Sequence, residues 1–246
     1  MRFAILSDIH GNREALNAVL ADLEARKIDR SILLGDIVGY GPDPEFCVDM
    51  AARLVGEGAV AIKGNHDSAI SNPTESMNVI ARAAIDWTRP RLDRAQTAFL
   101  ENLPYLHQEA EALFVHASAN EPQQWHYVTN DRRAIASFKA TDARVILCGH
   151  VHVPALMTYD LGGTVREHKI PHGADIPLLK SRRWLGVIGS IGQPRDGVPQ
   201  AGYAIFDSDK QELTFRRVPY DISKTIEKLR AAKLPEALAK RLNEGH

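Results

Sequence analysis

Several features that would mark a specialised class of protein are missing from this 246-residue sequence. It has only two cysteines, Cys47 and Cys148, so we expect no disulfide framework and a reducing, cytoplasmic location. Long apolar runs are also missing. The first run, at residues 3–6, ends at Ser7 and Asp8, so we expect neither a signal peptide nor a membrane span. The net charge of −1 argues against a generic nucleic-acid coat, and we expect no dedicated nucleic-acid-binding domain.

What is present is the composition of an ordinary globular chain, with 44% hydrophobic and 25% charged residues. Apolar runs alternate with helical patterns in residues 2–150, which predicts a largely parallel sheet. Short apolar segments between residues 155 and 218 predict a second, β-rich layer. We expect amphipathic helices at 221–242, broken near Pro235. The sequence therefore predicts one domain over residues 1–246, with residues 221–246 as a C-terminal helical extension.

Polar side chains that could bind a metal ion follow five predicted strands. The carboxyl ends of parallel strands share one edge of a sheet, where ligands bind in a crevice. We therefore expect these residues to converge although they are far apart in the sequence. They are Asp8 and His10 in SDIHGN, Asp36 in LGDIVG, Asn65 and His66 in KGNHD, His116 in FVHAS, and His150 and His152 in CGHVHVP.

Each of these motifs taken alone is also compatible with a polar turn. His150 and His152 would point to the same face of an extended segment, so they could grip one point in space or be two solvated side chains. The occurrence of all five motifs, each directly after a predicted strand, favours a common site.

The donor set indicates which metals such a site would hold. Imidazole, carboxylate and amide groups without a thiolate suit Mn, Fe, Zn or similar divalent ions. The candidates are too numerous for one catalytic ion with three protein ligands. They would suit two ions that share a bridging carboxylate, an arrangement used for displacement at phosphorus.

The order D-x-H, G-D, G-N-H-D, a lone His and G-H-x-H resembles the calcineurin-like metallophosphoesterases over residues 1 to about 207. This resemblance implies an α/β fold, a layered α-β-β-α sandwich of two mixed sheets flanked by helices, with a metal site at the carboxyl edge of the strands. It also implies two divalent metal ions, which could be Mn, Fe, Zn, Ni or Mg.

The resemblance assigns a role to each motif. His66 would assist departure of the leaving group, and Asp67 would orient His66. The first ion would be held by Asp8, His10, Asp36 and His152, and the second by Asp36, Asn65, His116 and His150.

The implied activity is hydrolysis of phosphodiester, phosphomonoester or phosphoanhydride bonds in small nucleotide-like substrates, by attack of a metal-bridged hydroxide. GDIVGYG lacks the Arg-Gly pair of protein Ser/Thr phosphatases, and Gly39 stands where purple acid phosphatases have a metal-binding Tyr. The chain therefore resembles a small bacterial and archaeal phosphodiesterase-like subgroup. The alternatives are a hydrolase of dinucleoside polyphosphates, of the diadenosine tetraphosphate type, and a non-catalytic protein-binding scaffold, although such scaffolds tend to lose the ligands kept here.

Some candidates concern the substrate and not the metals. We expect Asn65, Arg13 and Arg195 to contact a substrate phosphate, since Arg suits bidentate phosphate recognition. The polar-aromatic segment after His116, with Trp125 and Tyr127, could stack a nucleobase beside the metals or simply close over the core. The sequence makes no prediction of oligomeric state.

Overall fold

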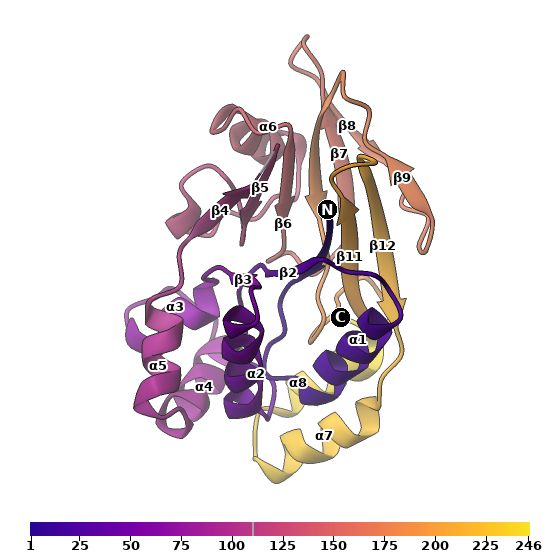
Figure 1. Cartoon of the computed structure of the whole chain (residues 1–246). Helices are drawn as coiled ribbons and strands as arrows, with labels where there is room; N and C mark the ends of the chain where they lie inside the picture. The colour runs from indigo at the N-terminus through magenta and orange to yellow at the C-terminus, as the bar shows by residue number, and fades with distance from the viewer. Residues whose placement is uncertain (110) are drawn as a thin grey trace.

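Two six-stranded sheets lie face to face in the computed structural model, which describes every residue except Ala110 (Figure 1). In spatial order, the first sheet consists of β3 (Val60–Ala61), β2 (Arg30–Leu33), β1 (Arg2–Leu6), β11 (Ala201–Asp207), β12 (Glu212–Val218) and β9 (Asp175–Pro177). The second consists of β4 (Leu106–Glu109), β5 (Ala112–Val115), β6 (Val145–Cys148), β10 (Arg183–Val187), β7 (Ala155–Tyr159) and β8 (Val165–His168).

Each sheet is mixed. In the first, β1 is parallel to β2, with Ile5 opposite Ile32, and antiparallel to β11. In the second, β6 is parallel to both β5 and β10, whereas β10 is antiparallel to β7. This arrangement confirms the expected fold of two mixed sheets.

The pattern of β1 shows why its apolar run is unbroken. Phe3 and Ile5 pack into the core between the two sheets, whereas Ala4 and Leu6 pack on the opposite face against the outer helices. Because side chains alternate along a strand and both faces of this one are covered, both sets must be apolar.

Helices cover the outer faces of the sandwich, and the predicted α-β-β-α layering is confirmed (Figure 1). Helix α1 (Arg13–Glu24) and helix α2 (Pro44–Gly56) pack on the first sheet, and α6 (Asp131–Lys139) packs on the second. Asn12 caps α1 by accepting a hydrogen bond from the Ala15 N–H at 3.1 Å. The remaining elements of the first half are α3 (Asn65–Ser71), α4 (Val79–Thr88), the short 3₁₀ helix η1 (Arg89–Arg91), α5 (Arg94–Glu101) and the 3₁₀ helix η2 (Pro122–Gln124).

The expectation that the second half forms a separate β-rich layer is wrong. Strands β11 and β12 join the first sheet beside β1, and β7, β8 and β10 extend the second sheet beside β6. The two halves of the chain therefore build both sheets together. The sequence of a hairpin does not show which sheet it joins. Either sheet can provide hydrogen bonds for its backbone and bury its apolar face.

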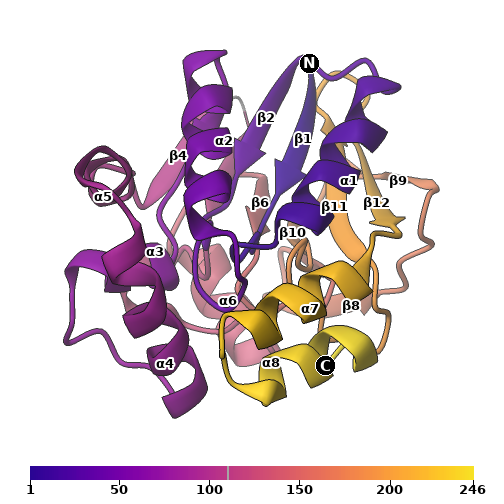
Figure 2. The same cartoon turned by 90° about the horizontal axis from the view of Figure 1, so that it is seen from below.

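The C-terminal helices α7 (Ile222–Ala231) and α8 (Glu236–Glu244) pack against each other below α1, with the predicted break at Pro235 (Figure 2). The Lys228 ammonium donates to Glu14 at 2.7 Å and to Asp43 at 2.8 Å, and so ties α7 to α1 and to the start of α2. The backbone of Gly197 also donates to Gly245 at 2.8 Å.

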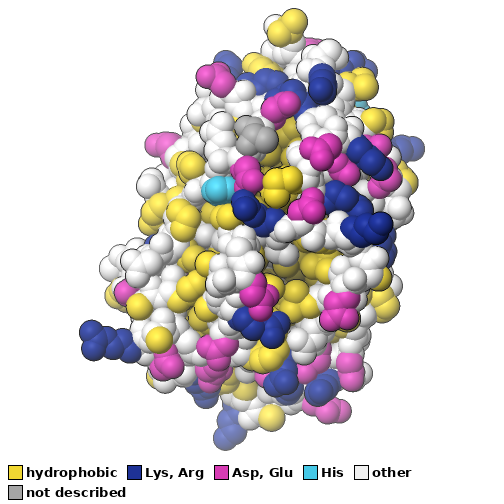
Figure 3. Space-filling view, viewed as in Figure 1, with side chains coloured by type: hydrophobic (Ala, Val, Ile, Leu, Met, Phe, Trp, Pro, Cys, Tyr) yellow, Lys and Arg dark blue, Asp and Glu magenta, His cyan; other side chains and the backbone are white. Residues whose placement is uncertain are grey.

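Basic and acidic side chains are interspersed over the face shown in Figure 3, in line with the small net charge. Among the helices that the structure describes, none is long and apolar enough to cross a membrane.

Candidate metal centre

The residues at the strand ends come together as predicted, but from two sheets and not from one. Asp8 and His10 follow β1, Asp36 follows β2, and Asn65 opens α3 after β3. The second sheet contributes three further side chains, His116 after β5 and both His150 and His152 after β6. All seven are buried except Asn65, which is half-buried. The parallel strands of both sheets end at this edge, so each sheet supplies part of the centre.

The first group of candidate ligands consists of Asp8, His10 and His152, whose donor atoms face one another. His152 Nε2 lies 3.1 Å from His10 Nε2 and 3.1 Å from Asp8 Oδ1. Among the described residues, Asp8 Oδ1 has no hydrogen-bond partner although it is fully buried. A buried carboxylate oxygen that faces imidazole nitrogens and accepts no hydrogen bond is suited to bind a cation.

The second group consists of Asp36, His116 and His150, with Asn65 beside it. His116 Nε2 lies 3.1 Å from His150 Nδ1 and 3.3 Å from Asn65 Oδ1. Asp36 Oδ2 is 3.5 Å from His116 Nε2 and 3.6 Å from His10 Nε2 of the first group. One carboxylate therefore stands between both sets of ligands, as a bridging ligand would.

His150 and His152 do not lie in an extended segment, contrary to the prediction. Strand β6 ends at Cys148, and the two histidines have φ angles of 65° and 64°. Asp8, His10 and Asp36 also have φ between 50° and 55°, a region that costs a non-glycine residue about 1–3 kcal/mol. The left-handed backbone turns the two imidazoles apart, so that His150 meets His116 and His152 meets His10. The pair spans both groups instead of gripping one point.

Backbone carbonyls fix three of the imidazoles from behind. The Nδ1 atoms of His10, His116 and His152 lie 3.0, 2.8 and 2.6 Å from the carbonyl oxygens of Val38, Leu34 and Gln193. An Nδ1–H donated to a carbonyl directs Nε2 into the centre, where it can bind a metal ion once it carries no proton. Sequence analysis missed Gln193, because a backbone acceptor in a distant loop has no side-chain signature.

The glycines of the motifs leave room for the ligands. A Cβ atom at Gly149 would lie 1.8 Å from Ser7 Oγ and 2.4 Å from Asp8 Oδ2. A Cβ atom at Gly64 would lie 2.1 Å from Asp36 Oδ1. The short approach of backbone to carboxylate therefore explains why glycine precedes Asn65 and His150 in these motifs.

The charges of the centre are strongly coupled. Burial opposes ionisation of Asp8, but the neighbouring His152 outweighs it and holds the pKa of the carboxyl group well below its usual range. Burial likewise opposes the charged form of His116, yet Asp36 raises the pKa of its imidazole to about 9. Burial and His116 together lower the pKa of His150 to about 3. Two ionised carboxylates among several imidazoles make this a site that attracts cations.

His66 lies beside both groups, and its Nδ1 has no hydrogen-bond partner within the described chain. Its ring contacts the rings of His10 and Tyr40, at centroid distances of 4.8 and 4.5 Å. Burial lowers the pKa of His66 to about 4. Its donor atom also falls within a group formed with His10 and Asp36, so its position allows ligation as well as contact with a substrate.

Asp67 does not orient His66 as expected. Its carboxylate accepts hydrogen bonds from the backbone N–H groups of Asp36 at 2.8 Å, Ile37 at 2.9 Å, Val38 at 3.3 Å and Gly64 at 3.0 Å. Burial and the charge of Asp36 raise its pKa to about 7, although the backbone donors oppose this. Asp67 therefore holds the loop that carries Asp36, a role that only the folded loop reveals.

Replacement of Asp67 by Ala is expected to lower the free energy of unfolding by about 3 kcal/mol or more, since each buried donor left unpaired costs about 1–3 kcal/mol. Urea unfolding measures the loss, and Asp67→Asn, which keeps an acceptor oxygen, should lose less. A change within about 0.5 kcal/mol of wild type, as expected for the exposed control Asp209→Ala, would contradict this role.

Of the two arginines predicted to contact substrate, the structure brings only Arg195 to the centre. Arg195 lines a cavity of about 80 Å³ together with Asp36, His66 and His152. It donates to Gln193 Oε1 at 2.9 Å, and so is directed by the same loop that holds His152. Arg13 is exposed on α1, where its guanidinium stacks on Phe46 at 4.3 Å. The prediction for Arg13 is therefore not supported by its position.

Comparison with known proteins gives concordant matches. The family profile of the calcineurin-like phosphoesterase superfamily domain matches residues 1–211. An uncharacterised protein of Methanocaldococcus jannaschii is 36% identical over 245 residues, which cover 97% of this chain and 96% of the relative. A metallophosphoesterase from Sphaerobacter thermophilus superposes with a TM-score of 0.87 at 39% identity, with 100% of both chains covered. A hypothetical protein from Pyrococcus horikoshii has the same fold, with a TM-score of 0.80 at 22% identity over 100% of this chain and 98% of the other. The family match spans the sequence positions of every candidate ligand described above.

Proposed function

The chain belongs to the calcineurin-like phosphoesterase superfamily, and we propose that it hydrolyses phosphoester bonds of small nucleotide-like substrates with the help of two divalent metal ions. The observation that carries this proposal is the position of Asp36, whose Oδ2 lies 3.6 Å from His10 in one ligand group and 3.5 Å from His116 in the other. A single carboxylate between two groups of imidazoles favours a dinuclear centre over two separate sites.

In this proposal the candidate ligands are divided between the two ions according to their positions. Asp8, His10 and His152 would hold one ion, Asn65, His116 and His150 the other, and Asp36 both. When bound, the ions would polarise the phosphoryl group and acidify a water molecule. Hydrolysis forms a bond from the water oxygen to phosphorus, breaks the bond to the leaving oxygen and transfers a proton to that oxygen.

Two residues outside the ligand groups would act on the substrate. His66, at the wall of the small cavity, would donate a proton or hydrogen bond to the leaving oxygen. Arg195, on the same wall, would bind a non-bridging phosphoryl oxygen. His66 directly follows Asn65, and Arg195 lies in the loop whose Gln193 carbonyl holds His152, so substrate and metal contacts would be fixed together.

Two further features belong to this proposal. Residues 1–246 would fold as one domain, because α7 is tied to Glu14 and Asp43 through Lys228, and Gly245 is bonded to the loop after Arg195. The protein would act in the cytoplasm, where Cys47 and Cys148, both buried and unpaired, remain reduced.

The proposal is tested by turnover of EDTA-treated protein after addition of Mn²⁺, Fe²⁺, Zn²⁺, Ni²⁺ or Mg²⁺. The substrates are p-nitrophenyl phosphate, bis-p-nitrophenyl phosphate and diadenosine tetraphosphate. We expect metal-dependent hydrolysis of at least one ester, and the fastest of the three substrates identifies the bond type. Hydrolysis of diadenosine tetraphosphate alone would favour the dinucleoside polyphosphate alternative. Absence of turnover with every ion and substrate would contradict an enzyme and favour the scaffold.

A further inference from the structure

A second, larger cavity of about 600 Å³ opens beside the metal centre. Its walls come from α3, from the chain after α3, from the segment around η2 and from the start of α6. Asn65 and His150 line it, so any occupant lies directly against the second group of ligands. Its volume falls within the range of about 300–1,000 Å³ that is typical of small-molecule sites.

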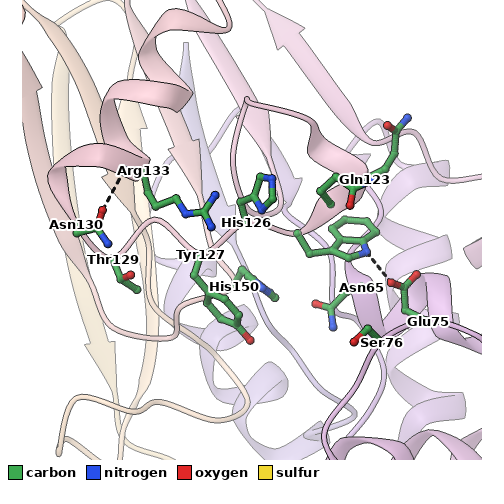
Figure 4. Close-up of a pocket in the computed structure, with 12 residues that line it drawn as sticks. Asn65, Glu75, Ser76, Gln123, His126, Tyr127, Thr129, Asn130, Arg133 and His150 are labelled. Atoms are coloured by element: carbon green, nitrogen blue, oxygen red, sulfur yellow. Dashed lines mark hydrogen bonds between the residues drawn. The ribbon is translucent and has the colours of Figure 1, made fainter.

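Tyr127 offers an aromatic surface in this cavity. Its ring stacks on the His150 imidazole, with the centroids 4.0 Å apart and the planes inclined by 25°. The side chain is nevertheless 50% exposed, because its remaining surface lines the cavity (Figure 4). A half-exposed ring fixed on a candidate metal ligand is suited to stack a planar group of a substrate.

Trp125 fixes the segment that presents Tyr127. Its Nε1 donates to Glu75 at 3.1 Å, and Glu75 accepts a second hydrogen bond from Ser68 of α3 at 3.0 Å. The indole also packs edge-on against His116, with a centroid distance of 5.8 Å. Trp125 and Glu121 flank η2 with φ angles of 52° and 50°, a backbone that non-glycine residues adopt at a cost. Of the two alternatives for this segment, Trp125 closes over a candidate ligand, and Tyr127 is left open to a second molecule.

Polar groups surround this aromatic surface. Arg133 lies on the side of Tyr127, and Glu75, Ser76 and Asn65 face it from the other side (Figure 4). Gln123 and Thr129 add hydrogen-bonding groups to the walls. A planar stacking surface within a ring of donors and acceptors matches a nucleoside, which has a flat base and a polar sugar.

The two cavities differ in which catalytic candidates they contain. His66 and Arg195 lie in the small cavity, whereas Tyr127, Asn65 and His150 line both. A phosphoryl group at the shared wall would place its leaving oxygen on the His66 side. The larger cavity then receives the substituent that stays on phosphorus.

We infer that the larger cavity binds a nucleoside that remains attached to the phosphoryl group, so that a nucleoside phosphodiester yields a nucleoside monophosphate and the other alcohol. The inference rests on the proposed function. In the reaction, the water oxygen bonds to phosphorus, the bond to the second alcohol breaks, and that alcohol takes up a proton.

The test compares two esters with the same leaving group, the p-nitrophenyl ester of thymidine 5′-phosphate and methyl p-nitrophenyl phosphate, on Mn²⁺-loaded protein. We expect kcat/KM to be higher for the nucleoside ester by about tenfold or more, as base–aromatic stacking predicts. Tyr127→Ala should lower this ratio toward one, and Tyr127→Phe, which keeps the ring, should retain it. Because the readout is a ratio, a general loss of activity does not mimic the result.

The outcomes separate the two proposals. Hydrolysis of both esters with a ratio near one, or with the wild-type ratio in Tyr127→Ala, would overturn the nucleoside site and leave the phosphoesterase intact. Turnover of neither ester would overturn the nucleoside site, and would overturn the phosphoesterase as well if p-nitrophenyl phosphate is also not hydrolysed with any divalent ion. Chromatography of the products from the methyl ester of thymidine 5′-phosphate shows which of its two phosphoester bonds is cleaved. Thymidine 5′-phosphate is the expected product, and free thymidine would contradict the inference.

Discussion

Asp36→Ala is expected to deplete both metal positions and to lower turnover by more than 100-fold. Removal of an outer partner of a metal ligand already costs about 10- to 100-fold in affinity or activity, and Asp36 would be a direct ligand shared by both groups. Its Oδ1 also accepts a hydrogen bond from the backbone N–H of His66 at 2.8 Å, so the variant removes a contact that holds the start of α3 as well. Elemental analysis and turnover of the purified variant measure the two effects.

The result needs a control for the loss of a carboxylate as such. Asp209→Ala removes an exposed pair with the N-terminus, which contributes little, and should keep wild-type metal content and turnover. His152→Ala provides a second comparison, because His152 belongs to the first group alone and should weaken one position more than the other. Wild-type metal content in Asp36→Ala would show that Asp36 does not bridge.

His66→Ala is expected to keep the metals and to lose catalysis. General acid catalysis contributes about 10²- to 10⁴-fold, and we expect kcat to fall by that amount while the bound metal stays at the wild-type level. The physical reason is that His66 faces the small cavity beside Arg195. Steady-state kinetics and elemental analysis on the same preparation separate the two quantities.

His172→Ala, which changes an exposed histidine, is the matched control and should behave as wild type. Wild-type turnover of His66→Ala would exclude a catalytic role for this side chain. Loss of metal in His66→Ala would instead make it a ligand, as its proximity to His10 and Asp36 permits.

The side chains of the centre could be predicted from the sequence because their signal is local. A short apolar strand followed by a polar ligand recurs five times, and strand periodicity places each candidate at a carboxyl end. The α-β-β-α layering came from the family resemblance, and the structure confirms it. Residues such as Asp8, Asp36 and His116 can therefore be assigned to one common edge without coordinates.

What could not be predicted depends on contacts between distant segments. Asp67 binds the backbone of a loop about 30 residues earlier, and Gln193 supports His152 through a carbonyl group. Neither contact can be recognised from the residue types, because each has a backbone group as one partner. The left-handed backbone at His150 and His152 likewise contradicts the strand periodicity, because strain imposed by the assembled site outweighs local preference.

The central claim is that two metal ions share one centre and that hydrolysis depends on both. The most direct test is a titration of metal-free protein with Mn²⁺ during turnover of bis-p-nitrophenyl phosphate at a protein concentration above the dissociation constants. The proposal predicts that activity rises until two equivalents per chain are bound and then stays constant. Full activity at one equivalent, or turnover that persists in EDTA, would contradict it.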